Sequence, residues 1–191
     1  MASFTKKAIV DSFYNLLQKK QLNQITVKDI VTDCGVNRNS FYYYFEDIPS
    51  LLTEEIDILC QRIMEKYSEQ DSIEDWIIYV LSLAKENRKI VNNCLSFIDR
   101  STYEKYMNKV FGYIISKYIE KTVEPDIVSD DDREIIVRFF IYQYTGFFID
   151  WFKNGMSDDI GRLISRTSYL QSGILEMMIS KARQQNIEKQ T

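Results

Sequence analysis

The sequence of 191 residues contains no histidine. Without an imidazole the chain cannot build a His-ligated metal site, a Ser-His-Asp triad or a Cys-His dyad, so many hydrolytic and metal-dependent mechanisms are excluded. The three cysteines, Cys34, Cys60 and Cys94, are widely spaced and form no C-x-x-C pair, which favours neither a zinc site nor a disulfide framework. We expect no metal, no cofactor and no enzymatic activity, and we expect Cys60 and Cys94 to be buried thiols.

Glycine and proline are also scarce, with 6 Gly and 2 Pro in the whole chain. So few turn-forming residues favour helices over a sandwich or barrel with many hairpins. The N-terminal segment lacks the charged-then-apolar layout of a signal peptide, and no apolar run approaches the roughly 18 to 20 residues of a membrane span. These features predict a cytoplasmic globular protein that does not contact a membrane.

The net charge of −4, taken as an average, argues against nucleic-acid binding, but the charges are unevenly distributed. Residues 1–45 carry six cations and three anions, a net +3, which leaves −7 for residues 46–191. A basic N-terminal segment can face an anion, although +3 is a weak electrostatic footprint for a DNA-binding domain. Charge alone leaves an ordinary solvated surface as an open alternative.

Apolar residues recur at helical spacing along the chain, and no strand-like alternation is long enough to build a sheet. Near the N-terminus, Thr26 can cap a short helix, with Asp29 completing a loose capping box. Gly35 can end that helix in the left-handed conformation, and a second short helix follows over residues 38–45. Two short helices across a tight glycine turn form a helix-turn-helix pattern. About nine helices are predicted in all, over residues 5–20, 27–34, 38–45, 49–67, 72–86, 88–98, 102–121, 130–154 and 158–181.

The second short helix carries more polar and aromatic residues than its packing needs. Val36, Phe41 and Phe45 can seat it in a core. The remaining residues form a face rich in hydrogen-bond donors and acceptors: Arg38, Asn39, Ser40, Tyr42, Tyr43 and Tyr44. Arginine can grip guanine N7 and O6, asparagine can grip adenine N6 and N7, and hydroxyl groups suit phosphate oxygens. A helix that displays these groups near its N-terminus fits the major groove of DNA. The tyrosines could instead cover a small three-helix core, and for Tyr42 that alternative is equally open.

Several residues match a known pattern in type and spacing over both short helices and the start of the next: Gly35-Val36, Ser40-Phe41-Tyr42, Tyr44-Phe45 and Leu51-Leu52. Through them, residues 5–55 resemble the TetR family of bacterial one-component transcriptional regulators. The segment, together with a Trp-Phe-x-x-Gly pattern at residues 151–155, is similar to a low-GC Gram-positive subgroup that includes dihydroxyacetone-kinase regulators. The resemblance implies an obligate homodimer that binds double-stranded DNA at a pseudo-palindromic operator. It also implies a C-terminal domain that dimerises and holds a small-molecule effector.

Carried across position by position, the resemblance assigns DNA contacts to Thr26, Lys28, Arg38, Asn39, Ser40, Tyr42, Tyr43 and Tyr44. Of these, Lys28 lies at the start of the supporting helix, whereas Arg38, Asn39, Ser40 and Tyr43 lie on the recognition helix and would touch bases or phosphates. Tyr42 and Tyr44 would mainly hold the DNA backbone.

The chain departs from the family pattern where the next helix begins. Relatives usually place a phosphate-gripping lysine there, but this chain has Ile48 preceded by Glu46 and Asp47, so we expect that contact to be missing. Asn39 replaces a small residue, which predicts a changed base preference. These departures keep open an alternative function: an adaptor or co-activator that retains the fold but acts through a partner protein.

The C-terminal part is predicted to dimerise. Eight of the fourteen residues from Phe139 to Phe152 are aromatic and are spread around the helix, which must therefore be covered on nearly every side. Burial against both its own bundle and a second subunit would cover it, and a monomer with an aromatic-rich core is the alternative. By the resemblance, the following apolar positions complete the interface: Ile160, Leu163, Ile164, Leu170, Ile174, Leu175 and Met178.

The helices of residues 72–152 are the candidate location of a ligand pocket, because several aromatic side chains with polar tips occur there. The candidates are Tyr79, Phe97, Tyr103, Tyr106, Phe111, Tyr113 and Tyr118. Aromatic residues at helical spacing are more often core than pocket, so we assign no ligand-binding residue.

Together with the resemblance, the sequence predicts an all-α homodimeric regulator that acts as a repressor. Residues 1–46 form a three-helix helix-turn-helix domain that binds DNA, and residues 47–191 form a helical bundle that dimerises and senses a ligand. Its two recognition helices must lie roughly 34 Å apart to reach successive major grooves, so an effector that favours another spacing releases the operator.

Overall fold

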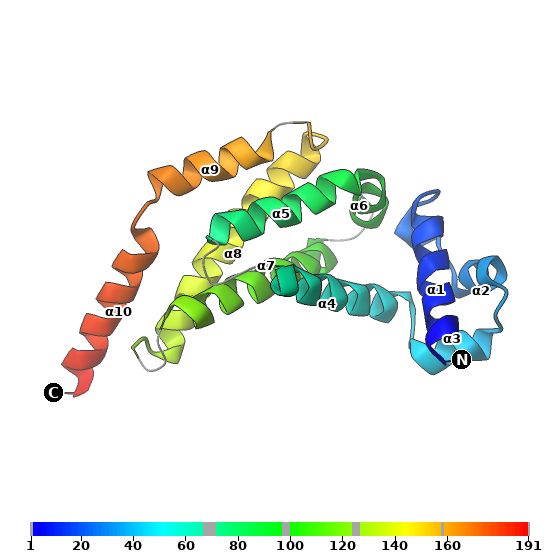
Figure 1. Ribbon diagram of the computed structural model, residues 1–191, viewed down its shortest axis with the longest axis horizontal. Coiled ribbons are helices and arrows are strands. Elements are labelled where there is room, and N and C mark those ends of the chain that lie inside the picture. The colour runs from blue at the N-terminus through cyan, green and yellow to red at the C-terminus, as the bar shows by residue number, and fades with distance from the viewer. Residues whose placement is uncertain (1, 67–71, 97–99, 124–126, 158, 191) are drawn as a thin grey trace. The chain divides into compact units, whose positions relative to one another are not determined.

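The computed structural model describes residues 2–66, 72–96, 100–123, 127–157 and 159–190, and every regular element among them is helical (Figure 1). The elements are α1 (Ala2–Leu17), the 3₁₀ helix η1 (Leu22–Gln24), α2 (Val27–Cys34), α3 (Arg38–Tyr44), α4 (Ile48–Lys66), α5 (Ile73–Glu86), α6 (Arg88–Leu95), α7 (Arg100–Thr122), α8 (Asp130–Lys153), α9 (Ile160–Leu170) and α10 (Ile174–Gln190). The predicted all-α fold class is confirmed. No helix in these ranges has the length and hydropathy that crossing a lipid bilayer requires.

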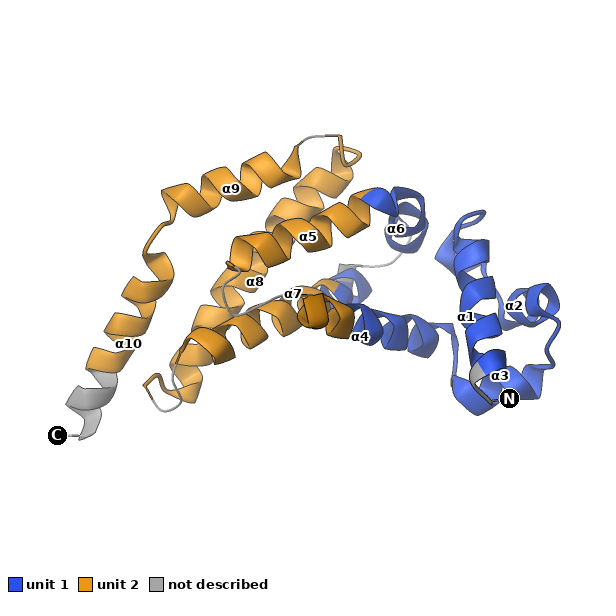
Figure 2. Ribbon diagram, in the orientation of Figure 1, with its two compact units in different colours: residues 1–59, 86–106 blue, residues 60–85, 107–191 orange. Residues whose placement is uncertain are grey.

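The chain divides into two compact units, which we describe separately (Figure 2). Unit 1 comprises residues 1–59 and 86–106, and unit 2 comprises residues 60–85 and 107–191. Unit 1 therefore contains α1, α2, α3 and α6 together with the first parts of α4 and α7.

Unit 1 is built on a hydrophobic core beneath the two short helices. Ile9 and Phe13 of α1, Ile30 of α2 and Phe41 of α3 are completely buried. Helix α6, which lies far along the sequence, packs Cys94 against this core. Burial raises the pKa of the Cys94 thiol to about 12, which makes it a structural thiol. Unit 1 is thus a helix-turn-helix supported by a helix from the middle of the chain.

Unit 2 is a helical bundle with an aromatic core. On α8 the buried side chains include Tyr144, Phe148 and Trp151. The Phe111 ring on α7 lies 6.4 Å from Tyr144 and 6.3 Å from Phe148 between ring centroids. Trp76 on α5 is 1% exposed, and its ring meets the Tyr118 ring of α7 edge-on at 5.8 Å between centroids, so α5, α7 and α8 all contribute rings to the core. Cys60 is buried, as expected of a structural thiol.

The prediction for the last helix is wrong. One helix was expected over residues 158–181, but the described residues from 159 onward form two, α9 and α10. The chain turns after Leu170, where the Gln171 N–H donates to the Thr167 carbonyl oxygen at 2.9 Å. Gly173 has a φ of +82°, a left-handed conformation that glycine adopts without steric cost. The described residues therefore contain ten α-helices rather than about nine.

Some predictions fall outside the described residues. The expected ends of two helices, at residues 67 and 98, lie there, as do residue 158 and the pocket candidate Phe97. Of the other pocket candidates, Tyr106 in unit 1 and Phe111 in unit 2 are buried.

Candidate nucleic-acid interface

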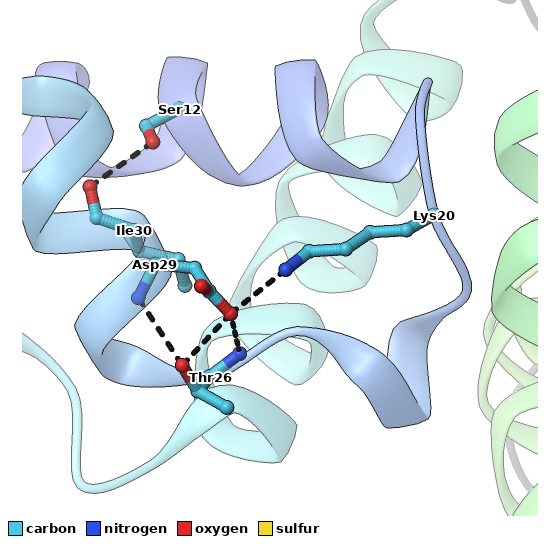
Figure 3. Close-up of polar contacts among 5 residues, drawn as sticks. All are labelled: Ser12, Lys20, Thr26, Asp29 and Ile30. Atoms are coloured by element: carbon cyan, nitrogen blue, oxygen red, sulfur yellow. Dashed lines mark hydrogen bonds and ion pairs between the residues drawn. The ribbon is translucent and has the colours of Figure 1, made fainter.

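The N-terminus of α2 is fixed by hydrogen bonds around Asp29 (Figure 3). The Asp29 N–H donates to Thr26 Oγ1 at 3.2 Å, and the Thr26 N–H and hydroxyl each donate to Asp29 Oδ2 at 2.8 Å. Lys20 Nζ donates to the same oxygen at 2.8 Å. The Lys20 contact, followed by those from Thr26, lowers the pKa of Asp29 to about 2. The predicted capping box is confirmed, and the Thr26 hydroxyl is occupied within it.

Helix α2 is tied to α1 through Ser12, a polar residue that is only 2% exposed. Its Oγ lies 3.1 Å from the Ile30 carbonyl oxygen and 2.7 Å from Asp33 Oδ2, so a single hydroxyl proton is shared between two acceptors. Figure 3 shows the contact with Ile30. Both ends of α2 are therefore held by polar contacts as well as by the apolar core.

The turn between α2 and α3 has the geometry that the sequence predicted. Gly35 lies at φ 71° and ψ 23°, in the left-handed region, and its N–H donates to the Val31 carbonyl oxygen. Asn37 then caps α3, because its Oδ1 accepts the Ser40 N–H at 2.8 Å and the Ser40 hydroxyl at 3.1 Å. These caps fix where α3 begins and set its direction relative to α2.

Helix α3 buries one side and exposes the other. Phe41 is fully buried and Phe45, just after the helix, is 3% exposed. In contrast, Tyr42 is 56% exposed and Tyr43 is 79% exposed. The Tyr42 ring packs edge-on against the Phe41 ring at 5.5 Å, so Tyr42 covers part of the core while most of its surface faces outward.

The eight predicted contact residues all lie on or next to α2 and α3 in unit 1, and they differ in exposure. Six are exposed: Thr26, Lys28, Arg38, Asn39, Tyr42 and Tyr43. Ser40 and Tyr44 are half-buried. Lys28 and Arg38 form no ion pair with another described residue, so their charges are available to an external anion.

The start of α4 has an acidic cap in place of a cation. The Ser50 N–H donates to Asp47 Oδ1 at 2.7 Å, and the Asp47 N–H donates to Ser50 Oγ at 3.1 Å. Ile48 is half-buried and packs against the core of unit 1. Ile48 therefore serves the fold, and the exposed neighbours Glu46 and Asp47 bring negative charge to this end of the helix.

Two of the six cations in residues 1–45 form ion pairs within unit 1, so their charges are not available to DNA. Lys6 pairs with Glu54 of α4 and lies 5.4 Å from the centroid of the Phe45 ring. Lys20 pairs with Asp29. Two further lysines, Lys7 and Lys19, are exposed, and sequence reasoning did not single them out. The charge count alone could not separate the paired lysines from the exposed ones.

Comparisons with known proteins agree with this architecture. The family model TetR_C_8, described as "Transcriptional regulator C-terminal region", matches residues 71–173. The structure resembles that of "Dihydroxyacetone kinase operon activator DhaS", with a TM-score of 0.62, 20% sequence identity and coverage of 94% of this chain and 96% of that chain. It also resembles a TetR transcriptional regulator from Streptococcus agalactiae 2603V, with a TM-score of 0.53, 21% identity and coverage of 77% and 84%.

At these identities the two structures show that the fold is shared. A search of curated proteins finds no significant match.

Proposed function

The chain belongs to the TetR family of transcriptional regulators, and we propose that it is a homodimeric, sequence-specific DNA-binding regulator. One observation carries this proposal: α3 is anchored by Phe41 and Phe45, yet it turns Arg38, Asn39 and Tyr43 outward, where packing does not need them. Donor and acceptor groups on an exposed, rigidly capped helix are what base readout in the major groove requires.

The remaining contacts in this proposal position the protein on the DNA backbone. Lys28 at the start of α2 is exposed and unpaired among the described residues, which suits a phosphate contact. Lys7 and Lys19, also exposed, add positive charge to the same unit. Tyr42 and Tyr44 would hold the DNA backbone from either side of the reading face. Thr26 can contribute only its methyl group, because its N–H and hydroxyl are occupied by the cap and its carbonyl oxygen accepts the Ile30 N–H.

In the proposed mechanism the protein is a cytoplasmic repressor without enzymatic activity. Two copies place their recognition helices roughly 34 Å apart, which matches two half-sites one helical turn apart. A small-molecule effector held by the C-terminal region, residues 47–191, favours a different spacing and so releases the operator. Residues 1–46 then serve as the DNA-binding part.

A second candidate function is an adaptor or co-activator that works through a partner protein. It is favoured by the acidic cap at the start of α4, where Glu46 and Asp47 are exposed and Ile48 is packed into the core. One structurally similar protein is named an operon activator. An adaptor would need no salt-sensitive affinity for DNA.

The experiment that separates the two functions is selection of random duplex DNA by the purified protein. Fluorescence anisotropy of the enriched sequence against a scrambled duplex, at two salt concentrations, then measures specificity and salt dependence. Enrichment of a pseudo-palindrome bound in a strongly salt-dependent way would support the DNA-binding regulator. Weak affinity without enrichment would contradict it and favour the adaptor.

Repression is tested separately with a reporter gene placed behind the selected sequence. A repressor lowers reporter expression when the protein is supplied, whereas an activator raises it.

A further inference from the structure

The exposed side of α3 is centred on two residues. Phe41 is completely buried and marks the direction of the core. With 3.6 residues per turn, Asn39 and Tyr43 lie roughly 160° and 200° around the helix axis from Phe41. They are separated by four residues and so lie in one row along the helix surface. This row faces directly away from the core of unit 1.

The other candidates on α3 are less well placed to read a base. Arg38 lies only about 60° around the axis from Phe41, on the flank of the exposed side. The Ser40 hydroxyl donates its single proton to Asn37 Oδ1. By contrast, the Asn39 side chain is exposed and makes no hydrogen bond to another described residue, so both ends of its amide are available.

Tyr43 is supported as well as exposed. Its ring meets the Tyr44 ring edge-on, with centroids 4.9 Å apart and planes at 90°. Tyr44 is half-buried and packs against the core of unit 1, so it gives the Tyr43 ring a fixed support. A side chain that is already braced loses less conformational freedom when it binds.

We propose that Asn39 and Tyr43 are the base-reading pair of each operator half-site, with Asn39 reading an adenine and the Tyr43 ring packing on the methyl group of a nearby thymine. This proposal rests on the proposed function. The Asn39 amide can accept from adenine N6 and donate to adenine N7, a pair of hydrogen bonds that no other base offers in the major groove. The apolar ring of Tyr43 suits the C5-methyl group, which only thymine carries.

The spacing of the two side chains limits where the thymine lies. Four residues of helix advance about 6 Å, which is close to two steps of 3.4 Å along a DNA strand. We therefore expect the thymine within about two base pairs of the adenine that Asn39 reads.

Base analogues in the selected operator test this proposal atom by atom. Each conserved adenine is replaced in turn by 7-deazaadenine, which lacks N7, and each conserved thymine by uracil, which lacks the methyl group. Dissociation constants are measured by anisotropy. For the wild-type protein, one 7-deazaadenine should weaken binding about tenfold, and one nearby uracil should weaken it about fourfold.

Variants then assign each effect to its side chain. In Asn39→Ala the 7-deazaadenine effect should fall below about twofold, and in Tyr43→Ala the uracil effect should disappear. Asn15→Ala is the control: it removes an exposed amide from α1, at a position with no assigned DNA contact, and it should leave both analogue effects unchanged. Both variant positions are exposed, and circular dichroism checks that the variants fold like the wild type.

The experiment distinguishes failure of the reading pair from failure of the DNA-binding function. Suppose that the wild type selects an operator but that Asn39→Ala and Tyr43→Ala show the same analogue effects as the wild type. The assignment of Asn39 and Tyr43 is then wrong, while the proposed DNA-binding function is retained. If the wild type selects no sequence at all, both the reading pair and the DNA-binding function are overturned.

Discussion

Single residues with polar side chains hold together helices that are too short to be stable alone. Helix α2 has eight residues and α3 has seven, whereas isolated helices shorter than about 12 to 15 residues are marginal in water. Thr26 caps α2 and Asn37 caps α3, and each satisfies backbone N–H groups that the helix itself leaves unpaired. The orientation of α3 therefore depends on contacts made by individual side chains.

The contacts of Asp29 predict a specific dependence of stability on pH. Lys20 and Thr26 lower the pKa of Asp29 from 3.8 to about 2. A carboxyl whose pKa is depressed in the folded state contributes stability above its unfolded pKa, and that contribution is lost as pH falls through the folded value. Between about pH 4 and pH 2, the melting temperature of the wild type should therefore fall more steeply than that of Asp29→Asn. Thermal unfolding followed by circular dichroism measures both curves, and parallel curves would contradict the assignment.

Lys28 and Arg38 should affect DNA binding in different ways. Lys28→Ala removes a proposed phosphate contact from each half-site, so it should weaken operator and scrambled DNA alike and reduce the slope of log affinity against log salt by about 2 in a dimer. Arg38→Ala should instead relax the preference for a guanine that flanks the bases read by Asn39 and Tyr43, by about 1–3 kcal/mol. Anisotropy titrations over a range of salt compare the two. Unchanged sequence preference in Arg38→Ala would remove Arg38 from base readout.

Helix α6 is a structural part of unit 1. The Asn93 Nδ2 donates to the Leu17 carbonyl oxygen at 2.7 Å, at the end of α1 where carbonyl groups lack partners within the helix. In the same helix, Ile90 and Cys94 pack against the core that seats α3. A helix from the middle of the chain therefore helps to hold the helix-turn-helix in place.

This docking predicts the effect of removing one side chain. Asn93→Ala leaves the Leu17 carbonyl oxygen without its donor and should lower the free energy of unfolding by about 1 kcal/mol. The neighbouring residue Asn92 is exposed, and Asn92→Ala is the matched control, which should change stability by less than about 0.5 kcal/mol. Urea denaturation measures both variants. Equal free energies of unfolding for Asn93→Ala and Asn92→Ala would mean that the hydrogen bond to Leu17 contributes no stability in solution.

The elements that could be predicted from the sequence are those set by local signals. The Thr26–Asp29 cap and the Gly35 turn were predicted correctly because the residues that determine each of them lie within four consecutive positions. The break at Gly173 was missed because apolar residues continue at helical spacing on both sides of it. The docking of α6 was missed because periodicity shows which face of a helix is apolar, but not which distant helix covers it.

At the candidate site, too, local patterns could be predicted from the sequence and tertiary contacts could not. The exposed face of α3 follows from its two buried anchors, Phe41 and Phe45, which the sequence pattern identified. The pairing of Lys6 with Glu54 joins residues on two different helices, so it depends on the tertiary fold. The charge available to DNA could therefore be read only from the structure.

Helix α8 of unit 2 exposes a row of large apolar side chains. Ile135, Phe139 and Tyr142 of α8 are 60%, 41% and 65% exposed and follow one another at spacings of four and three residues. The opposite side of the same helix is buried, as Tyr144 and Trp151 show. A contiguous row of exposed apolar side chains is typical of an interaction site. This row therefore supports the proposed homodimer.

This row predicts how the assembly can be broken and what that does to DNA binding. Tyr142→Lys places a cation in the row, and because a two-fold interface repeats every substitution, two charges would have to be desolvated. We expect the variant to elute at the 22.7 kDa mass of one chain in size-exclusion chromatography with light scattering, while the wild type elutes at twice that mass. Glu134→Gln is the control variant. It changes the charge by the same +1 at an exposed position of α8 outside the row, and it should remain dimeric.

The same variant should lose most of its operator affinity although its recognition helix is intact. A dimer binds the second half-site at the high effective concentration set by the first, and a monomer forfeits that gain of about 10² or more. Its weak, salt-dependent binding to scrambled DNA should persist, because that binding depends on the phosphate contacts of each subunit. A dimeric Tyr142→Lys protein would exclude the α8 row as the interface, and a monomeric variant with wild-type affinity would mean that one subunit recognises the operator by itself.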